Sequence, residues 1–159
     1  MCIPSDHSAL SGENEALVRQ YFDMWNTGDG RVADKILGAA YVDHAHPDVL
    51  GPARVRSLVP RFHAASPGSR IAIEILGADD EIVAVHTTLE LIRDGASTWT
   101  RGVSVFRIAG GKLAEQWTWL PRPEDGGPPS ACDVWEEAKR RIRLEDHRGL
   151  ADMFAIARP

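Results

Sequence analysis

Cysteine is scarce in this sequence: Cys2 and Cys132 are the only two among 159 residues. They form no CxxC pair and lie near opposite ends of the chain, so the sequence offers no disulfide framework. A zinc site built on cysteine pairs is excluded for the same reason. We therefore expect reduced thiols and a cytoplasmic protein.

Long hydrophobic runs and an excess of basic residues are also lacking. No apolar run approaches the roughly 18–20 residues that a membrane span needs, and the first residues lack the basic start and apolar stretch of a signal peptide. The 18 lysines and arginines are outnumbered by 23 aspartates and glutamates, which gives a formal net charge of −5. We therefore expect neither a nucleic acid nor a membrane as partner.

Several cofactor and nucleophile motifs are missing as well. No GxGxxG opens a helix after a strand and no GxxxxGK[ST] is present, so no nucleotide cofactor is indicated. No helix carries HExxH, and no GxSxG marks a serine nucleophile. A facial metal site would need His44, His46 and His86 to come together. We expect no metal and no other cofactor.

The second half of the chain is predicted to form a run of strands. Four segments alternate or run apolar at strand length, with short turn signals between them: Arg70–Gly77, Glu81–Arg93, Ser97–Ile108 and Lys112–Leu120. Three helix-like segments precede them: one that Ser11 is placed to cap and that ends at Asn26–Asp29, one over Arg31–Leu37, and one that starts near Gly51. Helices followed by a meander of antiparallel strands predict an α+β fold, in which a curved sheet covered by helices forms a pocket.

The composition divides the chain into four parts. Residues 1–10 are expected to be a flexible leader, and residues 11–120 a single domain. Residues 121–130 contain four prolines and two glycines and are typical of a linker. Residues 131–159 are charged and helix-like, and this appendage either packs back on the domain or covers a partner subunit.

The order and spacing of several motifs resemble one family. They are Tyr21-Phe22 and Trp25 in the first helix, Asn26-Thr27-Gly28-Asp29, Tyr41-Val42-Asp43-His44, Gly51-Pro52-Ala53-Arg54, and residues 80–86, 102–107 and 111–117. Over roughly residues 14–120 the chain resembles the SnoaL-like polyketide cyclase family of the NTF2-like superfamily. The resemblance implies a cone in which a curved antiparallel sheet wraps around a hydrophobic pocket closed by the first helices. The superfamily contains cyclases, isomerases, dehydratases, epoxide hydrolases, cofactor-independent hydroxylases and binding modules.

The last strand departs from the family pattern. In aldol-type members, an aspartate near the end of this strand takes a proton from the carbon next to a carbonyl. It often stands just after the strand's tryptophan or four positions later, where this chain has Thr118 and Pro121. If proton abstraction occurs, another residue must therefore perform it.

Histidines are the first alternative, because they titrate near neutrality and can act as general base or acid. His44 occupies a position where the family commonly has a histidine at the pocket edge. In an extended segment His44 and His46 would share a face, with Asp43 opposite. His86 lies within a strand, and Arg101 would stabilise a phenolate, enolate or carboxylate. The alternatives are a solvated loop for His44 and His46, a core or interface role for His86, and an exposed ion pair for Arg101.

Period-two alternation groups the remaining candidates for substrate binding. His86 shares a strand face with Glu90, Arg101 shares one with Trp99, and Glu115, Trp117 and Trp119 share a third. Tryptophans in a pocket offer flat apolar area and an indole N–H, but the same residues could be ordinary sheet core or a dimer interface. Tyr21, Trp25 and Phe62 are expected on the opposite, helical wall.

The sequence therefore predicts an enzyme of secondary metabolism that needs no cofactor and closes a ring or isomerises a polyketide-like, largely apolar substrate. His44 and His86 would transfer protons, and Arg101 or the indoles would stabilise an oxyanion. A hydroxylase or an epoxide-opening enzyme on the same fold is the second reading. A non-catalytic ligand-binding or dimerisation module is the third. We expect a homodimer, because an open sheet face rich in valine, leucine and tryptophan should be covered.

Overall fold

The computed structural model describes residues 9–119, 132–133, 135–136 and 139. The helices come first: α1 (Ala9–Thr27), the 3₁₀ helix η1 (Gly30–Val32), α2 (Ala33–Ile36) and α3 (Gly51–Ala65). The strands are β1 (Leu37–Asp43), β2 (Arg70–Ala78), β3 (Ile82–Arg93), β4 (Ala96–Ala109) and β5 (Lys112–Trp119). The α+β fold is confirmed, and the four predicted strands match β2 to β5 to within one residue at each end. No described helix is long and apolar enough to cross a membrane.

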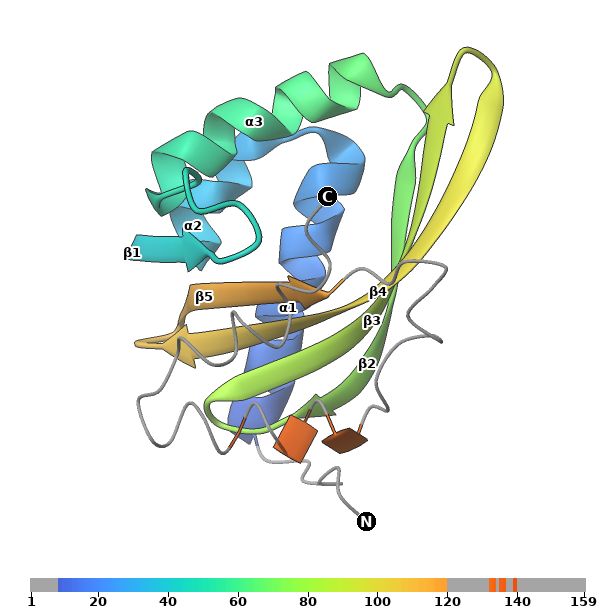
Figure 1. Ribbon diagram of the computed structural model, residues 1–159. Coiled ribbons are helices and arrows are strands. Elements are labelled where there is room, and N and C mark those ends of the chain that lie inside the picture. Colours follow the sequence, from blue (N-terminus) through green and yellow to red (C-terminus); the bar gives the residue numbers. More distant parts are fainter. Residues whose placement is uncertain (1–8, 120–131, 134, 137–138, 140–159) are drawn as a thin grey trace.

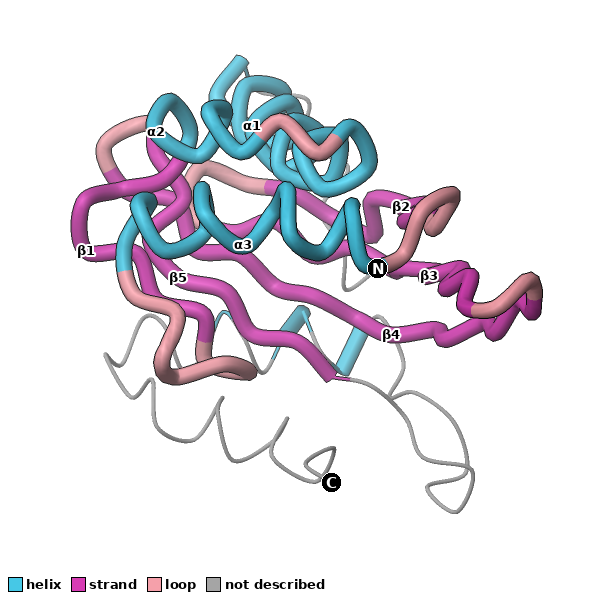
Figure 2. Tube along the Cα trace, turned by 90° about the horizontal axis from the view of Figure 1, so that it is seen from above, coloured by secondary structure: helices cyan, strands magenta, loops and turns pink. Residues whose placement is uncertain are grey.

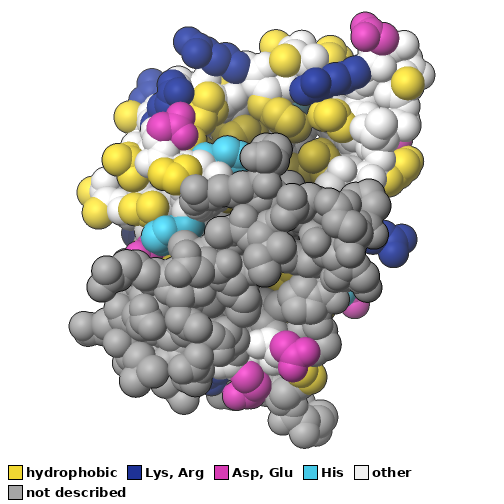
Figure 3. All heavy atoms as spheres, viewed as in Figure 1, with side chains coloured by type: hydrophobic (Ala, Val, Ile, Leu, Met, Phe, Trp, Pro, Cys, Tyr) yellow, Lys and Arg dark blue, Asp and Glu magenta, His cyan; other side chains and the backbone are white. Residues whose placement is uncertain are grey.

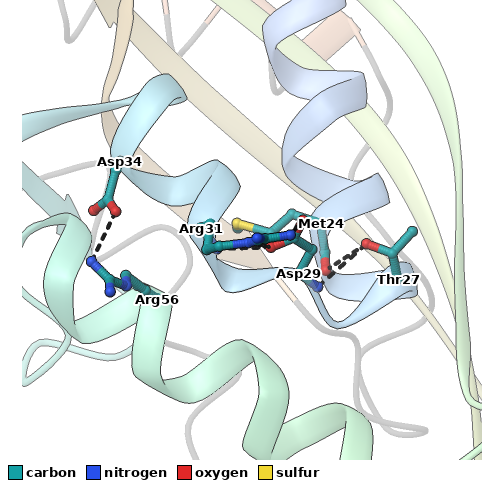
Figure 4. Close-up of polar contacts among 6 residues, drawn as sticks. All are labelled: Met24, Thr27, Asp29, Arg31, Asp34 and Arg56. Atoms are coloured by element: carbon teal, nitrogen blue, oxygen red, sulfur yellow. Dashed lines mark hydrogen bonds and ion pairs between the residues drawn. The ribbon is translucent and has the colours of Figure 1, made fainter.

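The end of α1 follows from its sequence. Gly28 has φ +79°, a left-handed conformation that suits glycine and stops the helix. The Thr27 hydroxyl donates to the Met24 carbonyl (3.4 Å), and the Asp29 carboxylate caps η1 and pairs with Arg31 (2.9 Å), as Figure 4 shows. The start of the helix differs from the prediction. It begins at Ala9, and Ser11 is buried inside it, so Ser11 is not its cap.

Helix α3 begins at Gly51, where φ is +74°, and Pro52 occupies its first turn, as predicted. Pro60 lies inside the helix, which continues to Ala65. Val55 and Val59 are buried. Arg56 pairs with Asp34 of α2 at 3.1 Å, which joins the two helices at the surface (Figure 4).

The five strands form one sheet in the order β1-β5-β4-β3-β2. The pairs β2–β3, β3–β4 and β4–β5 are antiparallel, as expected, but β1 pairs with β5 in parallel. The sheet is therefore mixed. Figure 1 shows the strong curvature of β2, β3 and β4, and Figure 2 shows α1, α2 and α3 on one side of the sheet.

We call the sheet face that contacts these helices the inner face. It carries Val83, Val85 and Phe106, which belong to the same core cluster as residues of α1 and α3. The Phe106 ring lies edge-on to Tyr21 (centroids 5.2 Å apart) and Phe22 (5.8 Å). Alternation then assigns the intervening residues to the opposite, outer face. Ala84, Val103, Val105 and Trp117 are fully buried on that outer face.

The described residues after β5 also contact the domain. Trp135 is 1% exposed, and Lys139 Nζ lies 2.8 Å from Asp79 Oδ2 at the β2–β3 turn. Figure 2 places these short helical pieces on the side of the sheet away from α1 and α3. The predicted linker over 121–130 lies outside the described residues, as do residues 1–8 of the leader and most of the appendage. Cys132 is disulfide-bonded, so the expectation of reduced thiols is wrong for this residue.

Candidate functional site

The strand register shows which predicted site residues lie on the outer face of the sheet and which lie on the inner, helical side. His86 pairs with Val103, Thr88 with Arg101 and Glu90 with Trp99, and residues paired across strands share a face. The groupings made from alternation are therefore correct, but the face they occupy is the outer one. It carries His86, Glu90, Trp99, Arg101, Glu115 and Trp117. The backbone of Trp119 pairs with Val103, and its side chain lies outside the described residues.

These outer residues differ in their surroundings. Trp99 is 65% exposed and Arg101 is exposed, whereas His86 is half-buried. Glu90 accepts a hydrogen bond from the Ser97 hydroxyl (3.1 Å). The catalytic and substrate-binding roles expected for these residues stay predictions, and they concern a face separated from the helical wall by the sheet.

His44 also lies on the outer face, beside Trp117 and Glu115 of β5. Its ring stacks on Trp117, with centroids 4.8 Å apart and planes 6° from parallel. Its Nε2 lies 3.7 Å from Glu115 Oε1, and Glu115 Oε2 accepts a hydrogen bond from Arg107 Nε (2.8 Å). The ring is thus oriented by stacking and by a carboxylate, and it lies on the other side of the sheet from Tyr21 and Trp25.

Asp43 and His46 form a hydrogen-bonded pair of titratable side chains near the inner face. The chain turns after β1 instead of staying extended, so the expectation that Asp43 lies opposite His46 is wrong. His46 Nδ1 is 3.0 Å from Asp43 Oδ2, and the Ala45 N–H donates to Asp43 Oδ1 (3.0 Å). Because the carboxylate only accepts, Nδ1 carries the hydrogen and Nε2 is left with a lone pair. The hydrogen bond from Asp43 raises the pKa of His46.

Asp43 points to the inner face. It is 8% exposed, its backbone is paired with Gln116, and it is in phase with the buried Tyr41 two residues earlier. Among the strand residues that the structure describes, it is the one carboxylate on this face. His46, by contrast, has a side chain that is 69% exposed. The pair therefore links a buried carboxylate to an accessible imidazole nitrogen.

A chain of uncharged polar groups continues along the inner face from this point. The Tyr41 hydroxyl donates to Gln116 Oε1 (2.7 Å), and Gln116 Nε2 donates to Thr118 Oγ1 (3.2 Å). Thr118 Oγ1 in turn lies 3.1 Å from Ser104 Oγ. Burial raises the pKa of the Tyr21 and Tyr41 hydroxyls, and the charge of Asp43 adds to both shifts. Both phenols therefore stay protonated at neutral pH and are able to donate hydrogen bonds.

Apolar side chains face this polar chain from the helices and the far strands. Trp25 lies edge-on to Phe62 (5.6 Å between centroids), so these two predicted residues meet on the helical wall with Tyr21 close by. Leu58, Ile71 and Ile73 are half-buried beside the core. Figure 3 shows hydrophobic side chains in a recess between α3 and the sheet, with a histidine at its edge. We call this hollow the inner recess.

No described group of three or more histidines, cysteines and carboxylates is arranged to hold a metal ion. Sequence reasoning passed over two features of the inner face: the Asp43–His46 pair and the hydrogen-bonded chain of Tyr41, Gln116, Thr118 and Ser104. The period of two across Tyr41 and Asp43 would have placed both on one strand face. Their pairing with β5 could not be foreseen, because β1 is parallel to a strand more than 70 residues later.

Comparison with known proteins gives the class to which this geometry belongs. The family model for the SnoaL-like domain matches residues 18–116, so the chain belongs to the SnoaL-like family. This confirms the resemblance found in the sequence. A search of curated proteins gave no match.

Solved structures support the same fold. A protein classed as a SnoaL-like polyketide cyclase from Jannaschia sp. CCS1 is 17% identical, with a TM-score of 0.61 over 74% of this chain and 91% of that one. An LEH-like epoxide hydrolase from M. tuberculosis is 21% identical, with a TM-score of 0.60 over 70% and 84%. An NTF2-like protein of unknown function from Mesorhizobium loti is 17% identical, with a TM-score of 0.59 over 75% and 97%. At these identities the likeness shows the NTF2-like fold alone.

Proposed function

We propose that the protein is a cofactor-independent acid–base enzyme that cyclises or isomerises a largely apolar, polyketide-like substrate in the inner recess. The observation that carries this proposal is the 3.0 Å contact between His46 Nδ1 and Asp43 Oδ2. It holds the imidazole in the tautomer whose Nε2 can accept a proton. Asp43 then stabilises the imidazolium that forms.

The reaction begins with transfer of a proton from a carbon next to a carbonyl to His46 Nε2. The electron pair left behind moves to the carbonyl oxygen and forms an enolate. Hydrogen-bond donors stabilise such an oxyanion, and the inner face offers the hydroxyl pair of Thr118 and Ser104. The enolate then either attacks a second carbonyl, which closes a ring, or takes the proton back at another carbon, which isomerises the substrate.

This proposal gives Asp43 and His46 the role that a strand aspartate has in aldol-type relatives. The residue just after Trp117 is Thr118, which has no basic group, so the base comes from β1, the neighbouring strand. A single inner-face carboxylate suits proton transfer by one base. Epoxide opening on the same fold is one alternative. Hydroxylation is a separate alternative, and it predicts oxygen consumption with the substrate.

The proposal includes one further part. We propose a homodimer, because family resemblance favours it. Light scattering coupled to size exclusion measures the mass, and a mass of one chain at micromolar concentration contradicts the dimer.

The test of the catalytic pair needs no knowledge of the natural substrate. 2-Tetralone is a neutral bicyclic ketone whose protons next to the carbonyl exchange slowly with solvent. We expect the protein to accelerate their replacement by deuterium in D₂O, and Asp43→Asn and His46→Gln to lower the catalysed rate by about 10²-fold or more. His86→Gln is the matched control on the outer face and should exchange at the wild-type rate. A non-catalytic binding module would bind 2-tetralone without accelerating exchange in any of these proteins.

A further inference from the structure

The hydroxyls of Thr118 and Ser104 lie where the polar chain meets the inner recess. Thr118 is the half-buried residue near the end of β5, and Ser104 is buried opposite it on β4. Both lie on the inner face, in register through Val85 with the half-buried Ile75 of β2, which shares that face with Ile71 and Ile73. The recess therefore has one wall of neutral hydrogen-bonding groups and one of apolar groups.

One hydroxyl hydrogen in this chain of hydrogen-bonded side chains is left without an acceptor among the residues that the structure describes. Gln116 Oε1 accepts from Tyr41, so Gln116 must present its Nε2 hydrogens to Thr118 Oγ1. Thr118 and Ser104 have two hydroxyl hydrogens between them, and their 3.1 Å contact uses one. Whichever residue donates in that contact, the hydroxyl hydrogen of the other has no acceptor among the described residues. A half-buried hydroxyl beside an apolar wall lowers its free energy by donating to a ligand oxygen.

We infer that the Thr118–Ser104 hydroxyl pair is a binding site for an uncharged ligand oxygen, either a carbonyl or a hydroxyl, and that it selects neutral, oxygenated ring compounds over anionic ones. The inference rests on the proposed function for the site's location and names the substrate class it takes. The selection against anions follows from charge. Asp43 lies on the same inner face, in register with Gln116, and its negative charge repels a carboxylate.

Orientation of the substrate also follows. An oxygen held at Thr118 lies at the β5–β4 end of the polar chain, and Asp43 of β1 is in register with Gln116, two residues before Thr118. A rigid ring that contacts Thr118 and extends along the inner face towards β1 approaches the Asp43–His46 pair. Thr118 is in this sense a specificity-determining residue, which holds the oxygen whose neighbouring carbon loses the proton.

Three bicyclic probes of nearly equal shape test the inference: 2-tetralone, the hydrocarbon 2-methylidenetetralin and the anion tetralin-2-carboxylate. Binding to the full chain is followed by tryptophan fluorescence or calorimetry. We expect the ketone to bind about 3- to 10-fold more tightly than the hydrocarbon, the range that one neutral hydrogen bond supplies, and the anion to bind most weakly. Equal or weaker binding of the ketone, or tightest binding of the anion, overturns the inference.

Variants locate the effect. The double variant Thr118→Val/Ser104→Ala removes both hydroxyls and should abolish the preference for the ketone, whereas Thr118→Ser should keep it. Thr88→Val, on the outer face of β3, is the matched control and should leave all three affinities unchanged. A ketone preference that survives in the double variant, with the fold confirmed by circular dichroism, overturns the assignment. Binding is measured apart from deuterium exchange, so loss of exchange with the ketone preference intact counts against the proposed catalysis alone.

Discussion

At the scale of single residues, the chemistry depends on how Asp43 and His46 are placed. Asp43 ends β1 with its carboxylate buried, and the turn that follows returns His46 to it. A free histidine has a pKa near 6.5, and the hydrogen bond to Asp43 raises that of His46. The imidazole can therefore both accept and return a proton at neutral pH.

The first prediction concerns this pKa. In Asp43→Asn the charge and the accepting carboxylate are lost, so the pKa of His46 should fall towards its ordinary value. The wild-type histidine should titrate above 6.5 and the variant histidine at a lower pH, measured by NMR of the imidazole carbons. Since the pKa is raised in the folded state, the pair stabilises the fold at low pH, and this contribution is lost as the pH rises through the His46 pKa. An unchanged titration in Asp43→Asn contradicts the hydrogen bond.

The residue scale is also where prediction from sequence reached its limit. Alternation correctly grouped His86 with Glu90 and Trp99 with Arg101, because a strand's period of two does not depend on its neighbours. Which group faces the helices depends on where α1 packs, and here Phe106 meets Tyr21 and Phe22. A strand with valines on both faces, such as β3, carries no local signal for that choice.

At the scale of elements, α1 is held against the sheet by packing and by specific hydrogen bonds. Phe106 of β4 is fully buried between Tyr21 and Phe22. Asn26 bonds with the backbone of Ile71 at the start of β2 through both its amide atoms (2.8 and 2.7 Å). These contacts hold in place the helix that carries Trp25.

The second prediction tests the packing. Phe106→Ala should lower the free energy of unfolding by about 3–5 kcal/mol, because it removes a buried ring and leaves a cavity. The measurement is denaturant unfolding followed by circular dichroism. Trp99→Ala is the control on the same strand. Trp99 is 65% exposed, so its removal should change stability by less than about 0.5 kcal/mol. Equal losses in the two variants would mean that Phe106 is not a core residue.

The third prediction tests the link between α1 and β2. Asn26→Ala leaves the Ile71 N–H and carbonyl without their partner and should cost about 1–3 kcal/mol. Amide hydrogen exchange should speed up at Ile71 while the exposed Gln20→Ala control on the same helix leaves it unchanged. Faster exchange spread evenly over all strands, instead of at the start of β2, would argue against a local link.

At the scale of the whole molecule, the elements and their order were accessible from the sequence. Turn residues such as Asp94-Gly95 and Gly110-Gly111 separate the strands. All four residues have positive φ, the left-handed conformation that such turns need. The mixed character of the sheet was not accessible, because the parallel pairing of β1 with β5 joins segments far apart in the chain. The sequence also left two possibilities for the C-terminal segment, packing on the domain or covering a partner subunit. The contacts of Trp135 and Lys139 with the domain likewise join segments far apart in the chain.

The fourth prediction concerns the C-terminal segment. Trp135 is buried and Lys139 pairs with Asp79, so removal of residues 131–159 should expose apolar surface. We expect the shortened chain to bind more of a hydrophobic dye and to self-associate more strongly than the full chain. Dye binding and association equal to those of the full chain would contradict the prediction.

Deuterium exchange into 2-tetralone is the measurement that decides between the two faces of the sheet. If the Asp43–His46 pair performs the chemistry, the wild-type protein and His86→Gln accelerate exchange above the buffer rate, and Asp43→Asn and His46→Gln return it to that rate. The opposite pattern, with exchange lost in His86→Gln and kept in Asp43→Asn and His46→Gln, would move the active site to the outer face and contradict the proposed function.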